Sequence, residues 1–377
     1  MLLPVSDCDQ VNALNHVLSI YFYRPTSSFS IASAIGILRN SLSQALVHFY
    51  QLAGRLHWTG NGGRLGLECN AMGALLYQAE TNAKIDDFAL AVAISHIIVD
   101  GASALHFIAE WARIARGESL DMVPFFDRTL LLAGDPPTPP RFDHAEFSPP
   151  PLLIGQSDNT EERKKETTVT MLQLSKEHVE KLKKMANDGR SSGFRAYSRY
   201  EVVAGHMWRC ACRAREHENK QLTKLRVAVN IRMRPPLPKG YFGNAVLTPL
   251  ATSQAGELVS RPLGYAAGRI REAVEMITDE YVRSSLDFVR SQSDVTQFRT
   301  FNTAGCTQGA FFGNPNLEIT SWMGLSNYNT DFGWGKEIYM GPGALGYDGK
   351  SIILSSHEED GSLVIALRTA DGPYGGF

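Results

Sequence analysis

The sequence predicts a mixed α/β (α+β) fold, and three observations carry this prediction. Helical and strand-like patterns alternate along both halves of the 377-residue chain, which is typical of layered sheets and helices. Hydrophobic residues make up 44% of the chain and charged residues 20%, so a sizeable core can form. The stretch Asp135–Pro151 carries seven prolines and no apolar periodicity, and we expect it to be an extended connection.

This connection predicts the domain organisation. We expect an N-terminal domain over residues 1–134, a connecting segment over 135–165 and a C-terminal domain over 166–377.

In the first half, turn residues and apolar spacing predict short strands and two helices. A strand should end before Arg24-Pro25, and apolar residues at helical spacing without proline predict a long helix after it. The expected strands are Ile20–Tyr23, Arg64–Cys69 and Ala91–Ser95, and the expected helices are Ile31–Leu52 and Ser103–Arg116.

In the second half, the same patterns predict three helices between strands. The helices are Glu177–Met185, Tyr200–Arg215 and a long one over Leu263–Val289. The strands are Val169–Leu174, Arg226–Ile231, Ile319–Leu325, Glu337–Met340, Ser351–Leu354 and Leu363–Leu367.

Charge and hydropathy exclude two classes of partner. The chain has 37 Lys and Arg against 39 Asp and Glu, so a basic nucleic-acid-binding face is not expected. No apolar stretch approaches the roughly 20 residues that a membrane-spanning helix needs.

The cysteines indicate free thiols in a reducing compartment. Their number is odd and they are widely spread, and Cys210 and Cys212 lack a second pair of ligands for zinc. The N-terminal residues do not resemble a secretory signal, so the cytoplasm is the expected location. The five cysteines are Cys8, Cys69, Cys210, Cys212 and Cys306.

The most informative segment is His96-Ile-Ile-Val-Asp100-Gly101. An apolar strand ends at a histidine, an aspartate follows four residues later, and a helix then begins after a glycine. A neutral histidine at a strand end can take a proton from a hydroxyl or amine as that group attacks a carbonyl. The alternative is a core histidine beside an aspartate that caps the helix.

Two further segments are unusual. Asp331-Phe-Gly-Trp-Gly335 places two glycines around a tryptophan, which predicts a tight loop held by aromatic packing, with Asp331 free to pair with an arginine. Tyr241-Phe-Gly-Asn244 follows a proline-rich turn. Each segment alone is a weak signal.

Together and in this order, the three segments resemble the H-x-x-x-D-G, Y-F-G-N and D-F-G-W-G motifs of the BAHD family of plant acyl-CoA-dependent acyltransferases. The resemblance covers most of the chain. It implies two similar-sized domains, each a mixed sheet with helices, in a chloramphenicol acetyltransferase-like fold with the active-site channel at the interface. It also implies acyl-CoA as co-substrate, no permanently bound cofactor or metal, and a monomer.

The resemblance implies roles for individual residues. His96 would be the general base, with the acceptor attacking the thioester directly, and Asp100 would turn toward an arginine and, with Gly101, orient the loop. Asp331 is a candidate catalytic residue in the family, although a structural ion pair is the favoured interpretation here, supported by Gly333 and Trp334. The expected substrate-binding residues are His16, Ser19, Tyr21, Thr320 and Trp322.

Within the family, several segments look most like the spermidine hydroxycinnamoyl transferase branch, whose products are phenolamides of plant secondary metabolism. They are Ser95–Gly117, Pro124–Leu132, Arg199–Glu218 and Pro235–Asn244.

The acceptor predicted on this basis is the amine of a polyamine such as spermidine. Relatives that use shikimate carry an arginine where this chain has Thr307, within the uncharged stretch Ala304–Gly313. Glu318 and Asp331 are the acidic candidates for binding an amine. The alternative is O-acylation of shikimate, quinate or another alcohol.

The chain also departs from the family pattern. Between Leu76 and His96, a helix and paired strands of the family are missing, and the family continues further at both ends. In Asn230-Ile-Arg232-Met-Arg234, an asparagine replaces the family's aspartate. Missing strands would leave an unpaired sheet edge, so the second alternative is a catalytically incompetent remnant.

Overall fold

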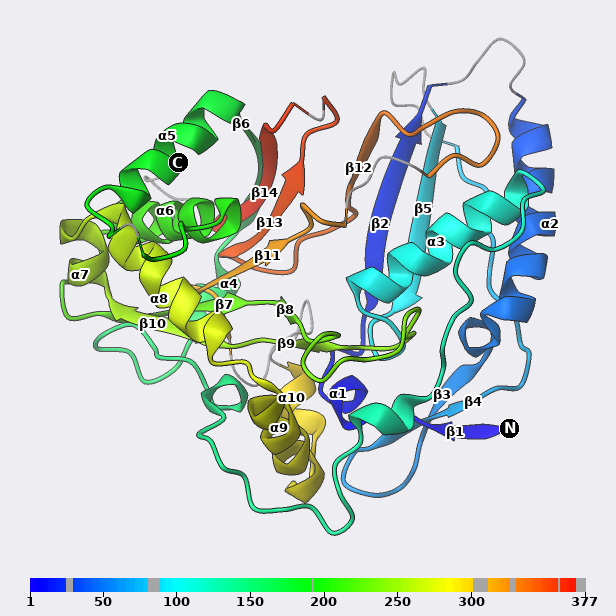
Figure 1. The fold of residues 1–377 in the computed structure, drawn as a ribbon, viewed down its shortest axis with the longest axis horizontal. Coiled ribbons are helices and arrows are strands. Elements are labelled where there is room, and N and C mark those ends of the chain that lie inside the picture. The colour runs from blue at the N-terminus through cyan, green and yellow to red at the C-terminus, as the bar shows by residue number, and fades with distance from the viewer. Residues whose placement is uncertain are drawn as a thin grey trace.

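Two main β-sheets organise the chain in the computed structural model, which describes residues 1–24, 30–80, 88–191, 193–300, 311–325, 330–358 and 360–370 (Figure 1). The helices are α1 Asp7–Gln10, α2 Ile31–His48, α3 Gly101–Ala115, α4 Thr160–Lys164, α5 Lys176–Asn187, α6 Arg199–Ala214, α7 Ala255–Ser260, α8 Leu263–Glu275, α9 Asp279–Ser291 and α10 Thr296–Thr300. The strands are β1 Leu2–Pro4, β2 His16–Tyr23, β3 Arg55–Trp58, β4 Leu65–Glu68, β5 Phe88–Ser95, β6 Thr167–Leu174, β7 Leu222–Val227, β8 Val229–Asn230, β9 Val246–Leu247, β10 Leu250–Gln254, β11 Leu317–Ser321, β12 Tyr339–Pro342, β13 Lys350–Ser355 and β14 Leu363–Ala370.

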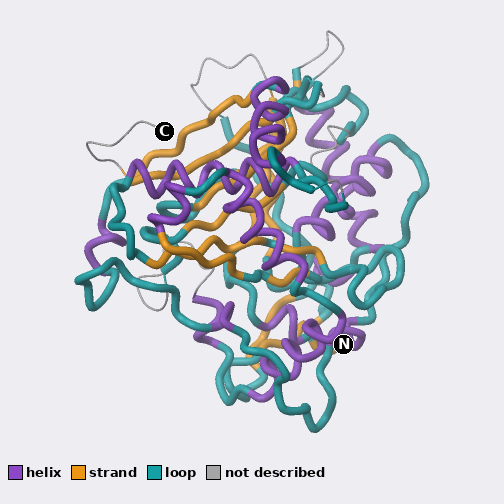
Figure 2. The backbone as a smooth tube through the Cα atoms, turned by 60° about the vertical axis from the view of Figure 1, so that its left-hand side comes forward, coloured by secondary structure: helices purple, strands orange, loops and turns teal. Residues whose placement is uncertain are grey.

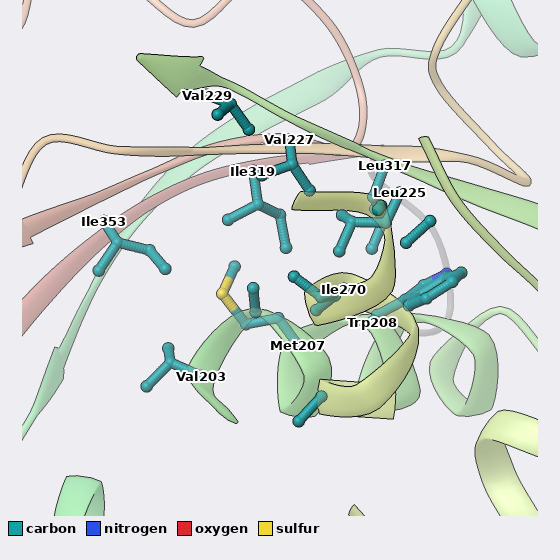
Figure 3. Close-up of a cluster of buried hydrophobic side chains, with 14 of the residues drawn as sticks. Val203, Met207, Trp208, Leu225, Val227, Val229, Ile270, Leu317, Ile319 and Ile353 are labelled. Carbon is teal, nitrogen blue, oxygen red and sulfur yellow. The ribbon is translucent and has the colours of Figure 1, made fainter. Parts of the chain in front are cut away.

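The larger sheet has six strands in the order β10-β7-β11-β13-β14-β6. β11 runs parallel to both of its neighbours, and the other pairs are antiparallel. Helices α6 and α8 lie against this sheet. The tube view shows helices packed against the strands of the sheet (Figure 2). Buried side chains of the two helices meet those of β7, β11 and β13 in one core; among them are Met207, Trp208, Ile270, Ile319 and Ile353 (Figure 3).

The smaller main sheet has three strands in the order β12-β2-β5, all antiparallel. Along β2 the side chains of Ser19, Tyr21 and Tyr23 are buried, because alternate residues of a strand point to one face. Helices α2 and α3 pack together on this side of the molecule, and Trp111 Nε1 donates to Ser41 Oγ at 2.9 Å. β5 is an edge of this sheet as described, and β12 joins it from the second half of the chain.

The proline-rich connection contains one short 3-10 helix, Ala145–Phe147, among its otherwise irregular residues. A buried cluster fixes it to α9. His144 contacts Ser284 Oγ through Nε2 at 2.9 Å and Glu146 Oε1 through Nδ1 at 3.2 Å, and Tyr281 OH donates to Glu146 Oε2 at 2.7 Å. The division into domains at this connection stays a prediction. Because β12 of the second half pairs with β2 of the first half, the two halves share a sheet.

The long helix predicted over Leu263–Val289 is wrong, because two helices occupy this segment. α8 ends at Glu275 and α9 begins at Asp279. Between them Thr278 is extended, with φ −97° and ψ 172°, and its side chain accepts a hydrogen bond from Tyr281 N at 3.2 Å. A threonine that caps the following helix ends the first one, although the apolar spacing continues across the break.

Other predicted elements differ at their ends. The strand expected over Arg226–Ile231 divides into β7 and β8, and the strand expected over Ile319–Leu325 ends at Ser321. In the part of the chain that the structure describes, no helix is both long and apolar enough to cross a membrane.

We expect Thr278→Ala to lower the free energy of unfolding by about 1 kcal/mol, because it removes the side-chain cap of α9. Chemical denaturation measures this change. Thr278→Ser keeps the hydroxyl and should retain most of the stability. Equal stability of the alanine variant and the unaltered protein would show that the cap does not stabilise α9.

Candidate active site

His96 lies between the end of β5 and the start of α3. His96 follows the last residue of β5, and the turn that leads to α3 buries Ile97 and Val99 completely. Asp100 caps α3, since its Oδ1 accepts from Ser103 N at 2.9 Å. The strand, turn and capped helix together hold His96 in one position.

Asp100 and Arg232 form a buried, bidentate ion pair. Arg232 Nη1 lies 2.7 Å from Oδ2, and Nη2 lies 2.9 Å from Oδ1. Ala245 N also donates to Oδ2 at 2.9 Å. Arg232 is therefore the arginine toward which Asp100 turns, and Asn230 supports it by accepting from Arg232 N at 3.0 Å.

The environment of Asp100 keeps it ionised. Burial by itself would raise the pKa of this carboxyl, but Arg232 and the amides of Ser103 and Ala245 outweigh burial and hold the pKa below its usual range. With Asp100 only 1% exposed, its charge is directed to Arg232 and away from solvent.

The His96 imidazole is set up to be neutral. Burial lowers its pKa, and the positive charge of Lys350 acts in the same direction, while Asp100 and Asn244 partly oppose the shift. Its Nδ1 is buried and has no hydrogen-bond partner among the described residues. A neutral imidazole can accept a proton from the hydroxyl or amine of a bound acceptor.

Asn244 fixes the backbone on which His96 sits. Its Nδ2 donates to the carbonyl oxygens of His96 at 2.8 Å and Ile97 at 3.1 Å, and also to Asp9 Oδ1 at 2.9 Å. Asp9 is completely buried, and its other oxygen lies 2.7 Å from Arg128 Nη1. The sequence marked the Tyr241–Asn244 motif without a role, and it gave no signal for Asp9 or Arg128.

The Asp331 loop lies elsewhere. Asp331 Oδ1 accepts from Gly333 N at 2.7 Å and from Gly335 N at 3.0 Å, and both glycines have φ +106°. Arg116, just beyond the end of α3, donates to the Asp331 carbonyl oxygen. Because α3 has 15 residues and so spans about 22 Å, Asp331 is far from the His96 end of this helix.

The sequence predicts an ion pair for Asp331, but its carboxylate accepts hydrogen bonds from backbone amides. Among the described residues, no arginine or lysine forms an ion pair with this carboxylate. Asp331 therefore stabilises the backbone of its own turn and does not pair with a cation.

Aromatic packing anchors the same loop, as the sequence predicts. The rings of Phe332 and Trp334 stack at 5.4 Å, and Phe332 meets Trp111 of α3 edge-on at 4.9 Å. Trp334 meets Tyr23 and Phe88 at 5.9 Å and 5.7 Å. Trp334 thus packs against the last residue of β2 and the first residue of β5, while Gly333 belongs to the turn that Asp331 closes.

The residues expected to bind substrate separate into two groups. Ser19 and Trp322 line an apolar cavity between β2, β5 and α3, together with Gly101 and Leu105. Tyr21 belongs to the core, where burial raises its pKa to about 12. His16 is exposed at the start of β2, opposite Ser95, and Thr320 is partly buried on β11.

No group of three or more His, Cys, Asp or Glu that could hold a metal ion occurs within the described ranges.

Comparisons with known proteins agree on one family. A family model described as the Transferase family matches residues 1–92 and 87–370. Hydroxycinnamoyl-CoA:piscidic acid hydroxycinnamoyltransferase of Actaea racemosa is 42% identical, covering 98% of this chain and 92% of that protein. Shikimate O-hydroxycinnamoyltransferase of Nicotiana tabacum and rosmarinate synthase of Plectranthus scutellarioides are each 38% identical, covering 96% and 97% of this chain and 91% of each relative.

Solved structures show the same fold. Vinorine synthase has a TM-score of 0.69 at 22% identity, covering 98% of this chain and 90% of that one. F. graminearum TRI101, complexed with coenzyme A and deoxynivalenol, has a TM-score of 0.75 at 14% identity, covering 98% and 95%. The predicted mixed α/β fold is confirmed.

Two features of the comparisons concern the segment before His96, where the sequence predicts a deletion relative to the family. The alignment with the Actaea protein runs over 415 positions, more than the 377 residues of this chain, and the family match divides at residues 87–92. That division falls at the start of β5, which is the sheet edge noted above.

We expect Arg232→Met to destabilise the protein by about 3–5 kcal/mol, because it leaves Asp100 as a buried carboxylate without a cation. The double variant Asp100→Asn/Arg232→Met should recover part of this loss. Denaturation of the three variants and the unaltered protein forms the complete cycle. Equal losses in the single Arg232→Met variant and the double variant would contradict the pairing.

The pH dependence follows from the lowered pKa of Asp100 in the folded protein. Its contribution to stability is present above the unfolded pKa of about 3.9 and is lost as the pH falls through the folded value. In Arg232→Met, burial is expected to raise the folded pKa of Asp100 instead. The stability difference between the variant and the unaltered protein should therefore shrink as the pH is lowered toward 4.

Proposed function

The chain belongs to the BAHD family of acyl-CoA-dependent acyltransferases, and on that basis we propose that it transfers a hydroxycinnamoyl group from CoA to a hydroxyl group of a small carboxylic acid. The observation that carries the proposal is the place of His96, directly after β5, between Ile94 and Gly101, which both line the apolar cavity; burial lowers the pKa of its imidazole. Two relatives are named for hydroxycinnamoyl transfer to piscidic acid and to shikimate, and a third is named for N-transfer to 5-hydroxyanthranilate. All three acceptors are carboxylic acids, and the first two carry no amine.

In the proposed mechanism, His96 takes the proton of the acceptor hydroxyl as its oxygen attacks the thioester carbonyl. The C–S bond then breaks, the acyl group stays on the acceptor oxygen, and the proton passes from His96 to the departing CoA sulfur. Thr320 and Trp322 on and beside β11 are proposed to donate hydrogen bonds to the oxyanion of the intermediate. Asp100 and Asn244 position His96 without touching substrate.

A polyamine acceptor is the second candidate. It is favoured by the uncharged stretch Ala304–Gly313 in the sequence, of which Thr307 lies outside the described residues. Both acidic groups suggested for an amine already accept hydrogen bonds from the protein. Glu318 accepts from Lys350 and Tyr347, and Asp331 accepts from the amides of its own loop. These contacts support the carboxylic acid over the amine.

We further propose a cytoplasmic monomer. The cysteines that the structure describes, Cys8, Cys69, Cys210 and Cys212, are free thiols, and Cys306 lies outside the described residues.

The acceptor assay offers shikimate, piscidic acid and spermidine separately with p-coumaroyl-CoA, and mass spectrometry identifies the products. We expect an ester of at least one acid. An amide of spermidine without any ester would replace the proposal by the polyamine candidate. No product, together with no rise in melting temperature at high CoA, would indicate the incompetent remnant.

His96→Ala should reduce kcat by at least about 100-fold, because general-base catalysis contributes 10²- to 10⁴-fold, while the fold is retained. His48→Ala, at the exposed end of α2, is the matched control and should keep full activity. Since the pKa of His96 is lowered, the acidic limb of the kcat/KM profile should lie below the usual histidine value of about 6.5. Full turnover of His96→Ala would refute the general-base role.

A further inference from the structure

A row of three charged residues crosses the middle of the larger sheet. The pairing of β7 with β11 sets Arg226 beside Glu318, and the pairing of β11 with β13 sets Glu318 beside Lys350. The register therefore brings together three residues that are far apart in the sequence.

This row lies on the face of the sheet that is turned away from α6 and α8. The sequence neighbours of the three residues, such as Leu225 and Ile319, point into the helix-covered core (Figure 3). Alternate residues of a strand point to opposite faces, so the charged row faces the other way. Ile352 and Leu354, on the same face as Lys350, pack with the core of the N-terminal half. The row thus borders the space between the two halves.

Glu318 is fully engaged by its neighbours. Lys350 Nζ donates to Oε1, and Tyr347 OH donates to Oε2. Burial would raise the pKa of Glu318, but Lys350 and Arg226 lower it to about 2, so the carboxylate is ionised. The nearby carboxylate of Asp348 pairs with Arg215 at 2.8 Å.

The row therefore holds two cations and one carboxylate. Arg226 is 4% exposed, donates to Thr248 Oγ1 at 2.9 Å and lies over the Phe312 ring at 4.9 Å. The ammonium of Lys350 has three hydrogens, and among the described residues only Glu318 accepts one. The Lys350 side chain is 22% exposed, so the remaining hydrogens can reach a ligand. A partly exposed ammonium with hydrogens to spare can bind a carboxylate through charge-assisted hydrogen bonds.

The row also lies close to the reacting groups. Glu318 precedes Thr320 by two residues on β11, so the two side chains point to the same face. Thr320 is one of the two residues proposed to stabilise the oxyanion, so the row and this part of the proposed site share one face of the sheet.

We propose that Lys350, oriented by Glu318 and assisted by Arg226, binds the carboxylate of the acceptor while His96 faces its hydroxyl. This inference rests on the proposed function and names the residues that select the acid. The sequence of Ala304–Gly313 contains no cation.

Two single variants test the proposal because they should act in opposite directions. Lys350→Met should raise the KM for the acid by about 10- to 100-fold, the value of a hydrogen bond to a charged group, with a smaller change in kcat. Glu318→Gln removes the competing carboxylate and should lower the same KM. A merely structural pair would impair both variants alike, and that result would overturn the proposal.

Control variants and substrates separate binding from folding. Lys350→Met/Glu318→Gln leaves no unpaired charge from this pair and should show the raised KM with a near-normal melting temperature, and Lys350→Arg should restore much of the affinity. The methyl ester of the acid should be insensitive to Lys350→Met. The KM for p-coumaroyl-CoA should not change, and a change confined to this KM would assign the site to a CoA phosphate and refute the proposal.

Calorimetry decides the case in which no acid is turned over. Shikimate is titrated into the protein with CoA present, so binding is read without chemistry. Binding that weakens in Lys350→Met would support the site even though the proposed function had failed. Absence of shikimate binding to the unaltered protein, or equal binding to both proteins, would overturn the inference.

Discussion

The Asp100–Arg232 ion pair is the contact on which the arrangement of the site depends. It joins the turn after β5 to the segment after β8, two parts of the chain that come from different halves. Burying two charges costs several kcal/mol each unless the remaining hydrogen bonds are satisfied. Here the guanidinium of Arg232 binds both carboxylate oxygens of Asp100. Each oxygen also accepts a hydrogen bond from one backbone amide, that of Ser103 or Ala245. The hydrogen bonds that offset the cost of burying these charges also fix the start of α3.

A second buried carboxylate, that of Asp9, also helps to fix the turn after β5. Asp9 receives Asn244 and Arg128, and Asn244 in turn holds the carbonyl groups of His96 and Ile97. A catalytic side chain on a turn would otherwise sample several backbone conformations. With the turn bonded on two sides, the backbone that carries His96 keeps one conformation, which is what a positioned catalytic side chain requires.

Much of this could be predicted from the sequence, since its signals are local. The apolar run before His96, the capping Asp100 and the glycines around Trp334 each determine a nearby backbone shape. The break at Thr278 was missed because the apolar spacing continues through it, and the partner of Asp331 was missed because a carboxylate can bond equally well to amides. Which strands lie side by side depends on register, and a single sequence does not reveal register.

The shared sheet has a consequence for how the protein is made. β2 pairs with β5 and also with β12, so a strand near the start of the chain needs a partner from residues 339–342. Contacts between residues so distant in sequence slow folding, because the chain loses the entropy of closing a long loop before the strand pairing can stabilise it. On the ribosome, the sheet that carries His96 therefore stays incomplete until nearly all of the chain has emerged. During that interval both edges of the β2–β5 pair are open, and open strand edges are where an incompletely folded chain can pair with other chains.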